Sequence, residues 1–145
     1  MKIAIGSDHG GYNLKEKVKV LLDDLGFEYK DFGPANTDSV DYPDFAQEVS
    51  FGVSRGAFER GILICGTGIG MSIAANKVKG VRAALCHDLF SAKATRQHNN
   101  SNILAMGERV IGSGLALEIV KTWLGEEFEG GRHQRRVDKI FKLEE

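Results

Sequence analysis

The chain has 145 residues, a length that fits one domain, and 42% of them are hydrophobic, which is enough for one core. Nineteen basic and twenty acidic side chains nearly cancel to a formal charge of −1, which excludes the strongly basic surface that nucleic acid or an anionic membrane requires. No apolar run is long enough for a signal peptide or a membrane span, so we expect a cytoplasmic protein. The two cysteines and four histidines lack metal-ligand spacing, and we expect no metal site.

Short strand-like runs alternate with helical patterns along the chain, which predicts one α/β domain over residues 1–145, a doubly wound parallel sheet with helices on both faces. The expected strands span residues 2–7, 27–32, 61–65, 81–86 and 103–106. Helices are expected from a cap at Asn13 to Gly26, around 45–53, from a glycine turn to near Gly80, over 89–97, around 115–123 and after 130–131.

The most informative segment is that glycine turn, where an apolar strand runs into Cys65 and then into Gly66, Gly68 and Gly70. Glycines allow a tight turn whose N–H groups approach a ligand, and a following helix contributes a positive dipole end. The spacing matches neither the dinucleotide-binding pattern nor the phosphate loop of NTPases. Two interpretations remain open, namely proton transfer by Cys65 or a buried structural thiol beside a packing turn.

Titratable side chains follow several predicted strands, at the edge where open parallel sheets bind ligands. They lie in Ser7-Asp8-His9, Cys65-Gly66-Thr67 and Cys86-His87-Asp88. A glycine pair after His9 would let Asp8 and His9 face the same crevice as Cys65. The alternative is that Asp8 or His9 only caps the first helix.

Two further groups lie in the second half of the chain. Arg132 and Arg136 stand four residues apart, so they would project from one helix face and could fork around a phosphate. The alternative is a solvated basic patch with His133 and Arg135. His98 lies in the polar segment 96–100, where a loop histidine is a proton donor, although the segment also fits an ordinary helix end.

Six short motifs, in order along nearly the whole chain, resemble the ribose-5-phosphate isomerase B family, the sugar-phosphate isomerases that include the galactose-6-phosphate isomerase subunits. They are Ser7-Asp8-His9-Gly10-Gly11, Asp41-Tyr42-Pro43, residues 61–70, Ser91-Ala92 with Arg96-Gln97-His98-Asn99, Gly107-Glu108-Arg109-Val110, and residues 130–137. The resemblance implies a Rossmann-like three-layer α/β/α domain, no metal and no organic cofactor. It also implies a homodimer or dimer of dimers, with the active site at the subunit interface.

The same resemblance implies roles for individual residues. Cys65 would be the base that moves a proton between C1 and C2 of the open-chain sugar, His98 the acid that opens the ring, and Thr67 a further catalytic residue. Some relatives use a glutamate near position 70 instead, but Gly70 stands here and Cys65 is present. The substrate-binding residues would be Asp8, His9, Tyr42, Gly66, Thr67, Gly68, Ile69, Gly70, Asn99, Arg109, Arg132, His133 and Arg136.

We therefore predict an aldose-ketose isomerase that interconverts ribose 5-phosphate and ribulose 5-phosphate through an enediolate. The alternatives within this class are hexose 6-phosphates of the allose or galactose type. Outside it, the chain could be a non-catalytic sugar-phosphate sensor or partner subunit. A third possibility is a redox module in which Cys65 and Cys86, at the ends of adjacent strands, form a reversible disulfide.

Overall fold

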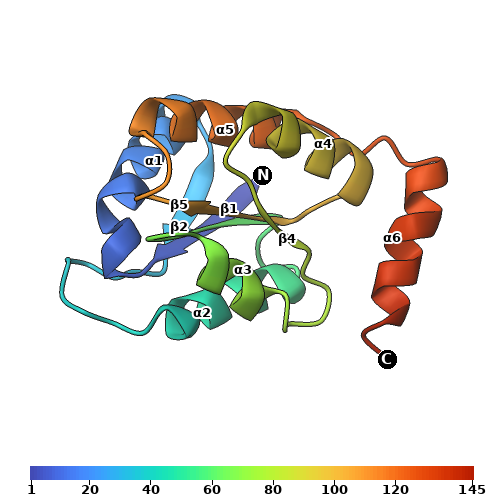
Figure 1. Cartoon of the computed structure of the whole chain (residues 1–145), viewed down its shortest axis with the longest axis horizontal. Coiled ribbons are helices and arrows are strands. Elements are labelled where there is room, and N and C mark those ends of the chain that lie inside the picture. The colour runs from blue at the N-terminus through green and yellow to red at the C-terminus, as the bar shows by residue number, and fades with distance from the viewer.

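The computed structural model describes residues 1–145 as alternating strands and helices (Figure 1). The strands are β1 (Lys2–Ser7), β2 (Glu28–Asp31), β3 (Arg60–Cys65), β4 (Ala83–Leu85) and β5 (Ile103–Gly107). The helices are α1 (Tyr12–Asp24), α2 (Tyr42–Ser54), α3 (Ile69–Ala75), α4 (Leu89–Asn99), α5 (Ser113–Gly125) and α6 (Arg132–Lys142), with a 3-10 turn at His9–Gly11. No helix combines the length and the apolar character needed to cross a membrane.

All five strands are parallel, in the order β2-β1-β3-β5-β4. The chain builds outward from β1 to β2 on one side and from β3 to β5 and β4 on the other. The strand order therefore reverses between β1 and β3, and a crevice opens there beyond their carboxyl ends. The predicted fold class, a doubly wound five-stranded parallel sheet in a three-layer arrangement, is confirmed.

Alternate residues of the central strands feed two cores, one on each face of the sheet. In β3, Ile62 and Ile64 join the larger core beneath α1, α4 and α5, whereas Leu63 and Cys65 join the smaller core beneath α2 and α3. Figure 1 shows the two helical layers above and below the sheet. The side chain of Cys65 therefore faces the α2 and α3 layer.

The start of α1 differs from the prediction, because Asn13 is not its cap. The helix begins at Tyr12, and Gly11 in the N-cap position offers no side chain. Instead the Asp8 carboxylate accepts hydrogen bonds from the N–H groups of Gly10 and Gly11, and the Glu108 carboxylate accepts one from the N–H of Leu14. A residue 94 positions away in the sequence thus supplies part of the cap, which no local pattern could indicate.

The arrangement of the strands also corrects the redox hypothesis. The strands that lead to Cys65 and Cys86 are β3 and β4, and β5 lies between them. Cys65 belongs to the smaller core and Cys86 to the larger one, so the sheet separates the two free thiols. An intramolecular disulfide between them is therefore wrong for this fold.

The last helix, α6, stands beside the body rather than on either face of the sheet (Figure 1). It packs mainly on α4 through its buried residues His133 and Val137. Near its end, Phe141 lies under the guanidinium of Arg82, with 4.7 Å between the guanidinium carbon and the ring centre, and the Glu144 carboxylate accepts from the N–H of Gly80. Apart from His133 and Val137, the residues of α6 are exposed to solvent.

Candidate active site

The site forms at the switch point because β1 and β3 are neighbours in register. Ser7 pairs with Ile64, and the N–H of Asp8 donates to the carbonyl of Ile64 over 3.2 Å. This pairing places the residue after β1 beside the end of β3, where Cys65 lies. The Asp8 carboxylate caps the 3-10 turn His9–Gly11 that precedes α1, and the same residue also lines the cavity described next.

A cavity of about 440 Å³ opens at this point. Its lining consists of Asp8, Tyr42, Cys65, Gly66, Thr67, Ile69, Gly70 and Ile73. Five of these eight residues come from the predicted glycine turn and its strand end, so the turn forms the floor of the cavity.

The sulfur of Cys65 is oriented by the turn that follows it. Only 5% of the residue is exposed, and its Sγ accepts a hydrogen bond from the N–H of Gly68 over 3.1 Å. Gly68 has a φ of 76°, and a Cβ there would meet backbone atoms of Met106 at 2.7 Å. Only glycine therefore fits the position that aims an N–H group at the sulfur.

The same turn leaves main-chain donors unused. The N–H of Ile69 donates to the Thr67 hydroxyl, but the N–H groups of Gly66, Thr67 and Gly70 make no hydrogen bond within the protein. All three residues line the cavity beside Cys65. Such donors favour an anion or a developing oxyanion, because they are already oriented and do not have to reorganise.

Two side chains from other parts of the chain, Tyr42 and Arg109, lie against this turn. A Cβ at Gly70 would clash with the ring of Tyr42, so the ring lies directly on the turn. A Cβ at Gly66 would lie 3.4 Å from Cδ of Arg109, which places that guanidinium arm over the floor of the cavity. The Arg109 side chain makes no hydrogen bond or ion pair within the chain.

His9 is adjacent to this cavity in sequence but is held by another contact. Its Nδ1 accepts a hydrogen bond from the N–H of Val40 over 3.1 Å, so Nε2 carries the proton of the neutral ring. Similarly, Nε2 of His87 accepts from the N–H of Gly107, and Asp88 caps α4. The third predicted strand end thus supplies structural contacts instead of catalytic groups.

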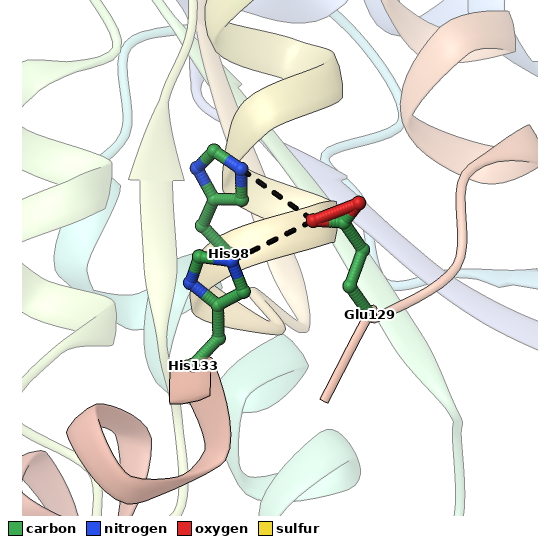
Figure 2. A group of neighbouring side chains, drawn as sticks. All are labelled: His98, Glu129 and His133. Atoms are coloured by element: carbon green, nitrogen blue, oxygen red, sulfur yellow. Dashed lines mark ion pairs between the residues drawn. The ribbon is translucent and has the colours of Figure 1, made fainter. Parts of the chain in front are cut away.

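A second group of side chains lies where α4 meets α6 (Figure 2). The rings of His98 and His133 stack with their centres 4.4 Å apart and an angle of 14° between their planes. One oxygen of Glu129 lies 3.7 Å from Nε2 of His98 and 3.6 Å from Nε2 of His133. His98 occupies the last turn of α4, so the expectation of a loop histidine is wrong and the helix-end alternative is confirmed.

Positive charge surrounds this second group. Arg132 and Arg136 extend from the exposed side of α6 and form no hydrogen bond or ion pair within the chain. Burial, the neighbouring His98 and these two guanidiniums hold the pKa of His133 below its usual value, against the opposing effect of Glu129. The pair of guanidiniums is therefore free to bind an anion.

The structure brings only part of the predicted site together within one chain. The cavity beside Cys65 contains no residue of α4 or α6, and Asn99 lines a different cavity. Eight predicted residues do not line the Cys65 cavity, namely His9, Gly68, His98, Asn99, Arg109, Arg132, His133 and Arg136.

Sequence reasoning missed two acidic residues near the site. Glu108 caps α1, and Glu129 lies beside the stacked histidines, close to Nε2 of each. The four-residue spacing from Glu129 to His133 is a signal that could have indicated the second contact. Nothing in the sequence near Glu108 indicates its contact with α1.

The fold and site define an α/β protein with a thiol and free main-chain amides at the switch point of a parallel sheet. The model of the Ribose/Galactose Isomerase family matches residues 3–140. The chain belongs to this family of sugar-phosphate isomerases, which confirms the resemblance and the enzyme class predicted from the six motifs.

Individual relatives cover nearly the whole chain. Ribose-5-phosphate isomerase B of Escherichia coli is 49% identical over 144 residues, which are 99% of this chain and 97% of the relative. The structure of Clostridium thermocellum ribose-5-phosphate isomerase B is similar with a TM-score of 0.98 and 58% identity, over 99% of this chain and 97% of that one. The structure of Mycoplasma genitalium ribose-5-phosphate isomerase B with bound ribulose-5-phosphate is similar with a TM-score of 0.96 and 46% identity, over 99% of this chain and 95% of that one. A D-erythrulose-4-phosphate isomerase of Pectobacterium atrosepticum is 45% identical, over 97% of this chain and 93% of the relative.

Proposed function

We propose that this protein interconverts ribose 5-phosphate and ribulose 5-phosphate, with Cys65 as the base that transfers the proton. The observation that carries the proposal is the Cys65 sulfur, which accepts the N–H of Gly68 and lies in a cavity with three unused N–H donors. Ribose-5-phosphate isomerases B among its full-length relatives support the choice of substrate.

The chemistry follows from these residue types. The Cys65 thiolate removes the proton from C2 of the open-chain aldose, and the electron pair forms the C1–C2 double bond of an enediolate with its charge on O1. The N–H groups of Gly66, Thr67 and Gly70 stabilise that oxygen without rearrangement. The thiol then returns the proton to C1 while the hydroxyl proton of O2 passes to O1, which leaves the ketose. Asp8 and His9 would hold hydroxyl groups of the sugar, and the Thr67 hydroxyl would help to orient the reacting end.

We further propose that a second copy of the chain completes the site. Its His98 would protonate the ring oxygen of the closed sugar, and its Asn99 would orient the open chain. Its Arg132 and Arg136 would bind the phosphate, with support from His133 and from Arg109. The exposed and unpaired guanidiniums of α6, and the position of that helix beside the body, support this arrangement. Phosphate binding far from the reacting carbons would fix C1 and C2 against the base.

Replacement of the thiol tests the mechanism. Cys65→Ala should abolish turnover of ribose 5-phosphate while leaving the circular dichroism spectrum and phosphate binding unchanged. The matched control is Cys86→Ala, which removes the other thiol from the opposite core and should lose stability but retain turnover. A Cys65→Ala protein with normal turnover would contradict the thiol-base mechanism.

Proton exchange separates catalysis from simple binding. In deuterated water, an isomerase incorporates deuterium from solvent at C2 of the aldose, whereas a sugar-phosphate sensor binds saturably without exchange. NMR of ribose 5-phosphate with the intact protein gives this answer directly. Bound sugar without deuterium at C2 would favour the sensor.

A panel of sugar phosphates decides the substrate. One additional or missing hydroxymethylene group typically changes discrimination by about 1–3 kcal/mol, so cross-activity with neighbouring chain lengths is expected. The panel should include four-carbon erythrulose 4-phosphate, because one relative carries that name, and allose and galactose 6-phosphates. We expect the highest kcat/KM for the five-carbon pair.

A further inference from the structure

Three arginines gather at the opposite edge of the sheet from Cys65. Arg60 begins β3, Arg82 immediately precedes β4, and Arg96 reaches toward them from α4. With Glu59, Asn100 and Asn102 they line a cavity of about 310 Å³ that contains no hydrophobic side chain. A cavity lined only by polar groups, half of them cationic, is suited to a charged ligand instead of an apolar one.

The three side chains are held in place by backbone carbonyls. Nη1 of Arg60 donates to the carbonyls of Trp123 and Leu124 at the end of α5, over 2.8 and 3.2 Å. Nε of Arg82 donates to the carbonyl of Asn100 over 2.9 Å.

Arg96 is only 6% exposed and donates to the Glu126 carbonyl, the Asn100 side chain and the Ser101 carbonyl. Nη2 of Arg82 and Nη2 of Arg96 have no partner in the protein. The guanidiniums are thus preorganised and still have donors to offer.

No carboxylate is paired directly with any of the three guanidiniums. None of the three forms an ion pair, and Glu59 is the one acidic side chain that lines the cavity. Acidic groups act on the three guanidiniums only through space, Glu59 and Glu127 on Arg60, Glu144 on Arg82 and Glu127 on Arg96. Burial, together with Arg60 and Arg82, lowers the pKa of Arg96 to about 10, so all three remain protonated at neutral pH. Partly buried like charges without a direct ion pair are unfavourable, and a bound anion relieves that cost.

We propose that the cavity lined by Arg60, Arg82 and Arg96 binds a small, multiply charged oxyanion, namely inorganic phosphate or the phosphate group of a monoester. Planar guanidinium groups donate paired N–H groups to such oxygens, and two of the three have unused nitrogens. The Asn100 side chain accepts from Arg96, and the Asn102 side chain accepts from the N–H of Arg82 and donates to the carbonyl of Gly80.

This site is separate from the proposed active site. Arg60 and Cys65 are the first and last residues of β3, so about 16 Å of strand lies between them. The proposal therefore does not depend on the isomerase chemistry. It does share an element with it, because Arg96 precedes His98 by two residues on α4.

The test removes the other predicted phosphate site first. In the full-length double variant Arg132→Ala/Arg136→Ala, thermal unfolding and calorimetry are followed while phosphate replaces chloride at constant ionic strength. We expect a saturable rise in the unfolding temperature, because a ligand that binds only the folded state stabilises it. If the salts only screened the charges, phosphate and chloride would give the same unfolding temperature.

Three further substitutions in this background assign the binding. Arg82→Gln should weaken phosphate binding about tenfold, equivalent to about 1.4 kcal/mol. Glu59→Gln, at an exposed side chain, removes the negative charge that lines the cavity and should strengthen phosphate binding. Lys93→Gln removes a positive charge from an exposed position of α4 outside the cavity and should change nothing.

Two ligands distinguish the sources of the phosphate group. Binding of inorganic phosphate and ribose 5-phosphate with similar affinity indicates recognition of the phosphate alone, whereas tighter binding of the sugar phosphate indicates a monoester site. Unfolding temperatures that do not respond to phosphate, or respond equally with Glu59→Gln and Arg82→Gln, would overturn the proposal. A negative result in these binding experiments would not change the outcome of the isomerase assays on the unsubstituted protein. The two proposals can therefore fail independently.

Discussion

Gly68 is the residue on which the orientation of the Cys65 sulfur depends, because its N–H donates to that sulfur. Its φ is positive, and a Cβ added there would lie 2.7 Å from a backbone atom of Met106, so there is no room for a side chain. Gly68→Ala should therefore lower the free energy of unfolding by about 2–3 kcal/mol, through backbone strain and overpacking. Urea denaturation measures this loss. The control is Gly114→Ala, which meets no atom within 4 Å and lies inside α5, where alanine should be neutral or stabilising.

His87 makes stability depend on pH. Burial lowers its pKa from 6.5, despite the opposing effect of Asp88, and its unprotonated Nε2 accepts the N–H of Gly107. Since the unfolded chain binds this proton more readily than the native state, stability should fall as pH decreases below about 6.5.

Between pH 7.5 and 5, the free energy of unfolding should therefore fall less for His87→Gln than for the unsubstituted protein. The glutamine amide oxygen can accept from the N–H of Gly107 without titrating. Equal pH dependence of the two proteins would argue against this role.

At the scale of elements, a buried lysine joins α1 to β2 and the loop after it. Lys15 is 0% exposed, and its Nζ donates to both oxygens of Asp31, at 2.8 and 2.9 Å, and to the carbonyl of Pro34 at 2.7 Å. Although burial acts to raise the pKa of Asp31, the hydrogen bonds from Lys15, Lys19 and Gly33 lower it overall.

Lys15→Met should destabilise the fold by about 3–5 kcal/mol, because it leaves a partly buried carboxylate and a carbonyl without their main donor. Chemical denaturation measures the change. Adding Asp31→Asn should restore part of the stability. A double variant no more stable than Lys15→Met would contradict the charge argument.

The sequence predicted most elements because they are built from local patterns. The alternation of strand and helix, the apolar face of α1 and the turn of Cys65 were all visible as periodicity and glycine spacing. What could not be predicted depends on distant contacts, as when Glu108 replaces Asn13 as the cap of α1. The short β4 is another case, since Val81 was expected to lie in the strand but precedes it.

At the scale of the whole molecule, the site was predicted in two halves. Asp8 and Cys65 follow neighbouring strands, so topology alone brings them together. His98 and Arg132 lie on α4 and α6, and only the family resemblance connects them with Cys65. A sequence pattern describes one chain, whereas the proposed site needs two.

Hybrid oligomers test this sharing. Cys65→Ala and His98→Asn proteins should each lack activity, but their coexpression should restore about a quarter of the wild-type turnover, because half of the random dimers contain one intact site. Mixing Cys65→Ala with Cys65→Ser is the matched control and should restore nothing. Inactive hybrids of verified dimers would show that each chain works alone.

The thiols of Cys65 and Cys86 lie on opposite faces of the sheet, and their access to reagents differs. Cys86 is 2% exposed among aliphatic side chains, and burial together with Asp88 raises its pKa to about 11. Cys65 borders an open cavity. An alkylating reagent therefore reaches one thiol per folded chain, and the mass of a single adduct counts the chains with an accessible Cys65 without any substrate.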